Sequence, residues 1–308
     1  MTKILADKIL TSSGWQENII VEINADGHIG KLRTDTKEYD HHVGCLLPAP
    51  VNAHSHSFQY AMAGMAELHE ITPNQNDFWS WRNAMYDLAL AINPDQLEDI
   101  ATMLYKEMLR NGYTHVAEFH YLHHDISGKK FNNISENGER LVSAAKKAGI
   151  KITLIPIFYQ MGGFGKNPEE KQRRFISETY TDYISLFDAS RKSTNHYCNA
   201  SAGIGIHSMR GVKEKDIIQL SQYRNKNTPF HIHVSEQLKE IEDCINHLGQ
   251  RPVEWLANNI ELNENYHLVH ATHINEKEIS KIAKSKANVV LCPSTEGNLG
   301  DGIFPLKE

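Results

Sequence analysis

The sequence predicts an α/β fold: a (β/α)8-type barrel that lacks its eighth strand, preceded by a small β-structured segment. Helical patterns alternate with apolar runs, as they do in successive βαβ units. Continuous apolar runs are typical of parallel strands that are buried on both faces, and seven are present: CLLPAPVNAH, THVAEFH, KITLIPIFY, SAGIGIHS, PFHIHVSE, YHLVHA and ANVVLCPS. A doubly wound open sheet is disfavoured because no glycine-rich phosphate turn follows the first run.

Residues 1–45 differ from the rest of the chain and are predicted to form a separate β segment. The stretch IIVEI at 19–23 is strand-like, and Asp26-Gly27 is a turn signal. We therefore divide the chain into residues 1–45 and a barrel at residues 46–308.

The clearest predicted helix follows Asn93-Pro94, where Asn93 can cap, Pro94 occupies the first helical position and Gln96 can complete a capping box. Gly112 is predicted to end this helix. Its apolar face, at helical spacing, consists of Leu97, Ile100, Ala101, Leu104 and Met108. Further helices are predicted at 135–148, 213–225 and 275–284.

Composition excludes several classes of function. Hydrophobic residues make up 40% of the 308 residues and charged residues 23%, which is ordinary for a globular protein. The net charge of -6 and the lack of a basic run argue against nucleic acid as a partner. No signal peptide or membrane span is recognisable, so we expect a cytoplasmic protein. The four cysteines lack metal-type spacing, and we interpret them as reduced packing residues.

Histidines at the ends of the predicted strands indicate a metal site. Residues i and i+2 of a strand face the same side, so His54 and His56 can bind one ion together. On the fifth strand we choose His233 as the ligand, because it lies closer to the strand end, and assign His231 a structural role. Burying several imidazoles without a partner is costly. Imidazole ligands suit zinc, although other first-row metals also fit.

Two further strand-end residues are candidates for proton transfer. Glu236 follows His233 by three residues, where the chain can turn it back toward a metal-activated water and let it carry a proton to a leaving nitrogen. His270, at the end of the sixth strand, can hydrogen-bond the attacking water or the substrate. For His273 we leave open a role beside the site or a solvated position.

Two arginines predict an anionic substrate. Arg82 lies in FWSWRNAMY and Arg210 in HSMR. A planar guanidinium can pair bidentately with a carboxylate. In an acidic protein, such local cations favour a carboxylate-bearing small molecule over a nucleobase.

The whole chain resembles the amidohydrolase superfamily, and within it the formimidoylglutamate deiminases of bacterial histidine degradation. The motifs that carry the resemblance occur in family order: NAHSHSFQYAMAGMAE, FWSWRNAMY, EFHYLHH, HIHVSEQ, LVHATH and CPSTEGNLGDG. The resemblance implies a TIM barrel of the metal-dependent hydrolase kind with a small β-sandwich, of which residues 1–45 would be the N-terminal part. It leaves a homodimer open.

The resemblance also implies roles for individual residues. One zinc would be held by His54, His56, His233 and an aspartate of strand eight, and Glu236 and His270 would be catalytic. The implied reaction is hydrolysis of N-formimidoyl-L-glutamate to N-formyl-L-glutamate and ammonia. The implied substrate contacts are Gln59, Arg82, Tyr121, His207 and Arg210.

The carboxyl end departs from the family pattern. The chain stops at GNLGDGIFPLKE, whereas the family continues through strand eight and the rest of the β-sandwich. We therefore expect a truncated chain without the fourth ligand, since Asp301 belongs to the loop after strand seven. The alternatives are an inactive or folding-defective remnant of the enzyme, or another deaminase of the superfamily that acts on a purine, a pyrimidine or a guanidine.

Overall fold

A computed structural model describes residues 1–35, 37–65, 77–223 and 227–307, with the side chains of 77–80 excepted. The chain forms two compact units, Met1–Pro50 and Val51–Glu308. No helix in the described ranges is both long and apolar enough to cross a membrane.

The first unit is a four-stranded sheet with the order β3-β2-β1-β4. Strand β1 pairs antiparallel with β2 and parallel with β4. Ala6, Ile9, Ile19 and Val21 form its small core. The strands predicted here are present, and the first two are longer than expected. Their bounds are β1 Thr2–Thr11, β2 Gly14–Ile23, β3 Ile29–Arg33 and β4 His41–Leu46.

The second unit contains a parallel sheet with the order β12-β11-β10-β9-β7-β6-β5, and β8 pairs with β7 beside this path. All seven predicted strands are present, which confirms the α/β barrel-type fold. The bounds are β5 Val51–Ser55, β6 His115–His120, β7 Lys151–Phe158, β8 Ala200–Ala202, β9 Ile204–Ser208, β10 Phe230–Val234, β11 Tyr266–His270 and β12 Asn288–Val290.

Two strand predictions were wrong in extent. Cys45 and Leu46, the start of the first predicted run, belong to β4 of the first unit, and β5 begins at Val51. Strand β12 ends at Val290, because Pro293 starts helix α9 only three residues later. Proline favours the first turn of a helix and cannot donate to a strand ladder.

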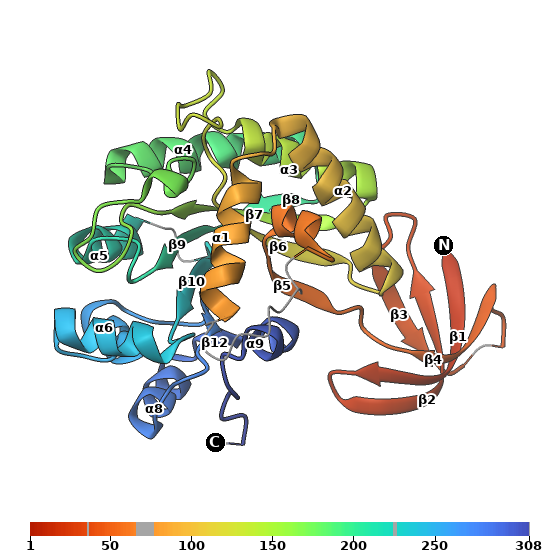
Figure 1. The fold of residues 1–308 in the computed structure, drawn as a ribbon. Helices are drawn as coiled ribbons and strands as arrows, with labels where there is room; N and C mark the ends of the chain where they lie inside the picture. Colours follow the sequence, from red (N-terminus) through yellow and green to blue (C-terminus); the bar gives the residue numbers. More distant parts are fainter. Residues whose placement is uncertain (36, 66–76, 224–226, 308) are drawn as a thin grey trace. The chain divides into compact units, whose positions relative to one another are not determined.

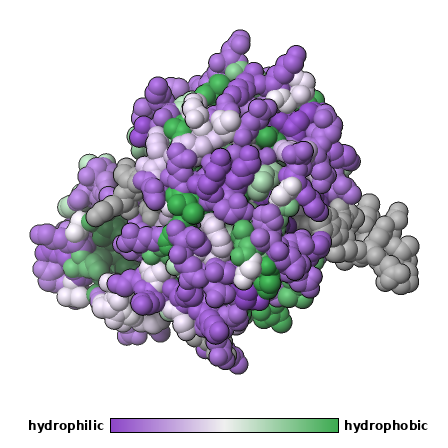
Figure 2. All heavy atoms as spheres, turned by 90° about the vertical axis from the view of Figure 1, so that its left-hand side faces the viewer, coloured by the Kyte–Doolittle hydropathy of each residue, from purple (hydrophilic) through white to green (hydrophobic). Residues whose placement is uncertain are grey.

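The helices of the second unit lie outside its strands (Figure 1). The face that Figure 2 turns to the viewer is mostly hydrophilic, as expected where helices pack their apolar sides inward. The helices are α1 Asp77–Ala89, α2 Pro94–Arg110, α3 Glu136–Ala148, α4 Tyr180–Ser193, α5 Glu214–Tyr223, α6 Leu238–Leu248, α7 Pro252–Asn259, α8 Glu276–Ser285 and α9 Pro293–Leu299, with the 3-10 turns η1 Ser57–Met62, η2 Glu170–Gln172 and η3 Thr194–His196.

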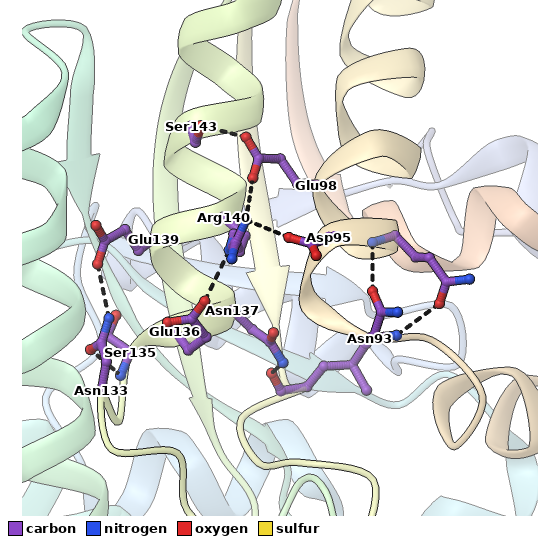
Figure 3. Close-up of polar contacts among 12 residues, drawn as sticks. Asn93, Asp95, Glu98, Asn133, Ser135, Glu136, Asn137, Glu139, Arg140 and Ser143 are labelled. Atoms are coloured by element: carbon purple, nitrogen blue, oxygen red, sulfur yellow. Dashed lines mark hydrogen bonds and ion pairs between the residues drawn. The ribbon is translucent and has the colours of Figure 1, made fainter.

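Helix α2 begins and packs as the sequence predicts. The capping box between Asn93 and Gln96 is complete. Glu98 on the same helix accepts hydrogen bonds from Arg140 and Ser143 of α3, which joins the two helices (Figure 3). The apolar face that we predicted from helical spacing is buried or partly buried in the core.

The cysteines only partly match their interpretation as packing residues. Cys244 is buried, whereas Cys45 and Cys198 are exposed. The interpretation was therefore wrong for these two, because a strand or loop position does not by itself tell which side faces solvent.

Candidate active site

All ten residues singled out from the sequence line one pocket at the carboxyl ends of the parallel strands. They come from segments as far apart in the sequence as His54 and His270, and from five of the seven strand ends. They are His54, His56, Gln59, Arg82, Tyr121, His207, Arg210, His233, Glu236 and His270. The carboxyl ends of parallel strands meet at one face of a barrel, which is the physical reason for the convergence.

Three imidazoles converge at the base of this pocket. The Nε2 atom of His54 lies 3.0 Å from Nε2 of His56 and 3.0 Å from Nε2 of His233. The opposite nitrogens are engaged elsewhere: Nδ1 of His56 donates to the carbonyl of Phe119 at 2.9 Å, and Nδ1 of His233 donates to the carbonyl of His207 at 3.0 Å. Both rings therefore turn an Nε2 lone pair toward His54 when they are neutral.

Burial keeps these rings neutral. It lowers the pKa of His56 to about 4, and it lowers the pKa values of His54 and His233 well below the usual value, with the neighbouring imidazoles adding to the effect. A neutral His54 can offer one proton at Nε2, so it can satisfy only one of the two lone pairs that face it. A divalent cation would accept the Nε2 lone pairs of all three histidines. The donor set thus fits a metal that prefers imidazole ligands.

Glu236 and His270 lie next to the three histidines and next to each other. Oε1 of Glu236 lies 3.5 Å from Nε2 of His270, while Nδ1 of His270 lies 3.2 Å from Oε1 of Glu296. Burial lowers the pKa of His270, but the two carboxylates outweigh it and raise the pKa above its usual value. An imidazole between two carboxylates is thereby favoured in its protonated form.

The backbone at these strand ends adopts sparsely populated conformations. Ser235 has φ +54°, His270 has φ +71° and Ala271 has φ +50°. Such left-handed conformations are uncommon for residues other than glycine, and the surrounding structure must hold them. They stand where β10 and β11 end, next to or at the pocket residues Glu236 and His270.

The lining of the pocket also includes the two arginines. Arg82 donates from Nε to the Tyr86 hydroxyl at 2.7 Å, and its Nη2 lies 3.6 Å from Oε1 of Glu169. Nη2 of Arg210 lies 3.9 Å from Oε2 of Glu240. Both guanidinium groups therefore face one cavity that can receive an anionic molecule.

Neutral polar and aromatic groups complete the lining. Gln59 donates from Nε2 to the Tyr121 hydroxyl at 2.9 Å. The ring of His207 stacks on Tyr159, with centroids 4.1 Å apart and an interplanar angle of 20°. Burial lowers the pKa of His207, and Arg210 adds to this effect. His207 is therefore a neutral wall residue rather than a second cation.

His231 and His273, the two other strand-end histidines considered from the sequence, are not part of the pocket lining. His231 is buried two residues before His233 on β10, and its ring stacks on that of His267 with centroids 4.3 Å apart. His273 is partly buried and bonds to the carbonyl of Asp301. Asp301 is grouped with Glu236 and His270, not with the three convergent histidines.

Several residues of the site were not found from the sequence. Tyr86 and Tyr159 line the pocket, and Glu240 and Glu296 contact Arg210 and His270. Glu296 stands in the CPSTEGNLGDG motif, which was a usable signal. Glu240 stands on a helix with several other acidic residues, and nothing in its local sequence distinguishes it.

Comparisons with known proteins identify the family of this chain. The model of the "Amidohydrolase family" matches residues 45–308, and that of the "Formimidoylglutamate deiminase HutF, N-terminal domain" matches residues 1–38. A formimidoylglutamate deiminase of Pseudomonas aeruginosa is 43% identical over 314 residues, which cover 100% of this chain and 68% of that protein. A 5-methylthioadenosine/S-adenosylhomocysteine deaminase of Thermodesulfovibrio yellowstonii is 23% identical, over 88% of this chain and 55% of that protein.

Solved structures show the same fold. A crystal structure of an amidohydrolase from Brucella melitensis matches with a TM-score of 0.93 and 41% identity, over 99% of this chain and 68% of that chain. An adenosine deaminase from Xanthomonas campestris, with bound zinc, matches with a TM-score of 0.75 and 19% identity, over 99% and 65%. The chain thus spans about two thirds of the length of these solved structures.

Proposed function

The chain belongs to the amidohydrolase family and within it to the formimidoylglutamate deiminases, and we propose that its pocket hydrolyses N-formimidoyl-L-glutamate to N-formyl-L-glutamate and ammonia. The observation that carries this proposal is a pocket lined by both three convergent imidazoles and two arginines. The substrate has a C=N bond to hydrolyse and two carboxylates to bind, which matches both features.

We propose that His54, His56 and His233 hold one zinc ion. Their neutral rings and their 3.0 Å Nε2 separations support this assignment. When bound, zinc supplies Lewis acidity and lowers the pKa of a water ligand to about 7. The hydrogen bonds from Nδ1 of His56 and His233 to backbone carbonyls would orient both rings for this purpose.

We assign proton transfer to Glu236 and His270. Glu236 would accept the two protons of the attacking water one after the other and pass each of them to the nitrogen that leaves as ammonia. His270, which lies between Glu236 and Glu296, would donate a hydrogen bond to the oxygen that becomes the formyl carbonyl. The water thus supplies the oxygen of the product and the protons of the leaving ammonia, so atoms balance.

We assign substrate binding to Arg82 and Arg210, which would pair with the two carboxylates, and to Gln59, Tyr121 and His207, which would shape the cavity around the formimidoyl group. The location of all five in one pocket supports these roles. A neutral purine nucleoside offers no carboxylate that could pair with either guanidinium group.

Ammonia release tests the substrate. Protein purified with zinc should release ammonia from N-formimidoyl-L-glutamate, and much more slowly or not at all from adenosine or 5'-methylthioadenosine. Equal or higher rates on the nucleosides would overturn the substrate assignment. The change Arg210→Gln should raise KM for formimidoylglutamate, because it removes one carboxylate partner.

Two buried histidines of β10 provide a matched test of the metal site. We expect about one zinc per chain in the wild type, measured by elemental analysis. His233→Asn should lose most of this zinc, whereas His231→Asn should retain it, because His231 lies outside the convergent set. Equal zinc contents in the two variants would contradict the ligand assignment.

We also propose a cytoplasmic location and, for residues 1–45, the N-terminal part of a β-sandwich. The reduced state of the cysteines supports the location, since all four are free. The four-stranded sheet of the first unit supports the second proposal.

A further inference from the structure

Glu240 is a buried carboxylate beside the pocket that has no part in the reaction described above. It lies in the first turn of α6 and is 1% exposed. It is not among the residues that line the substrate pocket. Resting on the proposed function, we propose that Glu240 is a positioning residue that holds Glu236 and Arg210 in their working places.

Both oxygens of Glu240 bind the turn that carries Glu236. Oε1 accepts a hydrogen bond from the backbone N–H of Ser235 at 3.1 Å, and Oε2 accepts one from the N–H of Glu236 itself at 3.2 Å. Hydrogen bonds from backbone N–H groups to a carboxylate are charge-assisted and stronger than neutral ones. Glu240 therefore fixes the backbone from which the proposed proton carrier extends.

This turn needs such support because its backbone is strained. Ser235 has φ +54° and is fully buried. A residue with a Cβ atom adopts this conformation at a cost, and the conformation persists only where contacts over-determine it. Besides Glu240, the N–H of His273 donates to the Ser235 carbonyl at 3.0 Å. Glu240 contributes the bonds to the N–H side of the turn.

The carboxylate of Glu240 also forms an ion pair with Arg210, which lies on the loop after β9. Oε2 of Glu240 lies 3.9 Å from Nη2 of Arg210, and Nε of Arg210 is buried without a hydrogen-bond partner among the described residues. A buried cation requires an anion nearby, which Glu240 provides. At 3.9 Å the contact is an ion pair without a hydrogen bond, so it does not use the donors that would bind a substrate carboxylate.

Two loops from different strands thus depend on one side chain. In Glu240→Gln the amide keeps one acceptor, but its NH₂ group faces the second backbone N–H, and the charge opposite Arg210 is lost. We expect kcat to fall about 10- to 100-fold, because small misplacements of catalytic groups have effects of this size. Binding of N-formyl-L-glutamate, measured by calorimetry on the zinc-loaded protein, should weaken as well.

Glu278 offers a matched control. It is fully buried, accepts from Nε of Arg251 at 2.8 Å and from the backbone N–H groups of Asn275 and Glu254. Glu278→Gln removes the same kind of carboxylate at a distance from the pocket. It should lower thermal stability and leave kcat, KM and product binding unchanged.

Amide hydrogen exchange supplies a readout that does not depend on activity. The backbone amides around Ser235 and Glu236 should exchange faster in Glu240→Gln than in the wild type. In Glu278→Gln they should exchange at the wild-type rate. Unchanged exchange and unchanged kcat in Glu240→Gln, or equal effects of both variants on activity, would overturn the proposal. If the wild type releases no ammonia, the substrate assignment fails, and the exchange comparison still tests Glu240.

Discussion

The exchange Glu118→Gln probes a buried carboxylate that contacts the segment after His54 and His56. Glu118 lies on β6 and is 1% exposed. Its Oε1 accepts a hydrogen bond at 2.7 Å from the backbone N–H of Ser57, the residue that follows His56. Its Oε2 accepts a hydrogen bond at 3.1 Å from the Tyr105 hydroxyl. A glutamine can keep both contacts, because its oxygen accepts from Ser57 and its NH₂ group can donate to the Tyr105 oxygen.

The effect of Glu118 on the free energy of unfolding follows from the pKa of its carboxyl group. Burial raises the pKa of Glu118 from 4.5 to about 7, although hydrogen bonds from Ser57, Ser55 and Tyr105 act in the opposite direction. The folded state therefore binds this proton more tightly than the unfolded state. Stability from Glu118 is fully present below pH 4.5 and is lost as the pH rises through 7. A difference of about 2.5 in pKa corresponds to about 3 kcal/mol.

Glutamine does not titrate, so the free energy of unfolding of the variant should rise relative to that of the wild type as the pH increases. We expect the two free energies of unfolding to be similar near pH 5 and to differ by up to about 3 kcal/mol at pH 8 in favour of Glu118→Gln. Urea unfolding of the two zinc-loaded proteins at several pH values measures this difference. A difference that stays constant from pH 5 to 8, or one that favours the wild type at high pH, would refute the reasoning.

Two further changes test contacts within the second unit. For Glu98, burial raises the pKa, but hydrogen bonds from Lys147, Ser143 and Arg140 outweigh it and hold the pKa at about 2. Glu98→Gln should therefore lower the free energy of unfolding by about 1–2 kcal/mol at pH 7. This is less than the full pKa shift implies, because the charged partners are partly exposed. This cost should shrink as the pH falls from 4.5 toward 2, opposite to Glu118→Gln, and an unchanged cost in acid unfolding curves would count against it. Gly205→Ala should lower the unfolding free energy by about 1–3 kcal/mol, because a Cβ would meet the His231 carbonyl at 2.7 Å and Ile157 at 2.8 Å. A melting temperature equal to that of Gly44→Ala, which meets nothing within 4 Å, would argue against this.

The features that the sequence predicted well depend on neighbours in the chain. The capping box at Asn93 and Gln96 needs only residues three positions apart, and it is present. Seven apolar runs identified the seven strands, because buried parallel strands are apolar on both faces. Strand bounds were less predictable: Cys45 and Leu46 joined the sheet of the first unit, and Pro293 cut the seventh run short.

The sequence by itself determined that His54 and His56 share one side of a strand end, since side chains of a strand alternate with a period of two. Only the tertiary structure decided that the Nε2 atom of His233, 179 positions away, lies 3.0 Å from that of His54. It likewise brought Glu240 to Arg210 and Glu118 to Ser57. Local rules govern dihedral periodicity and caps, whereas distances between strand ends depend on how the whole sheet curves and packs.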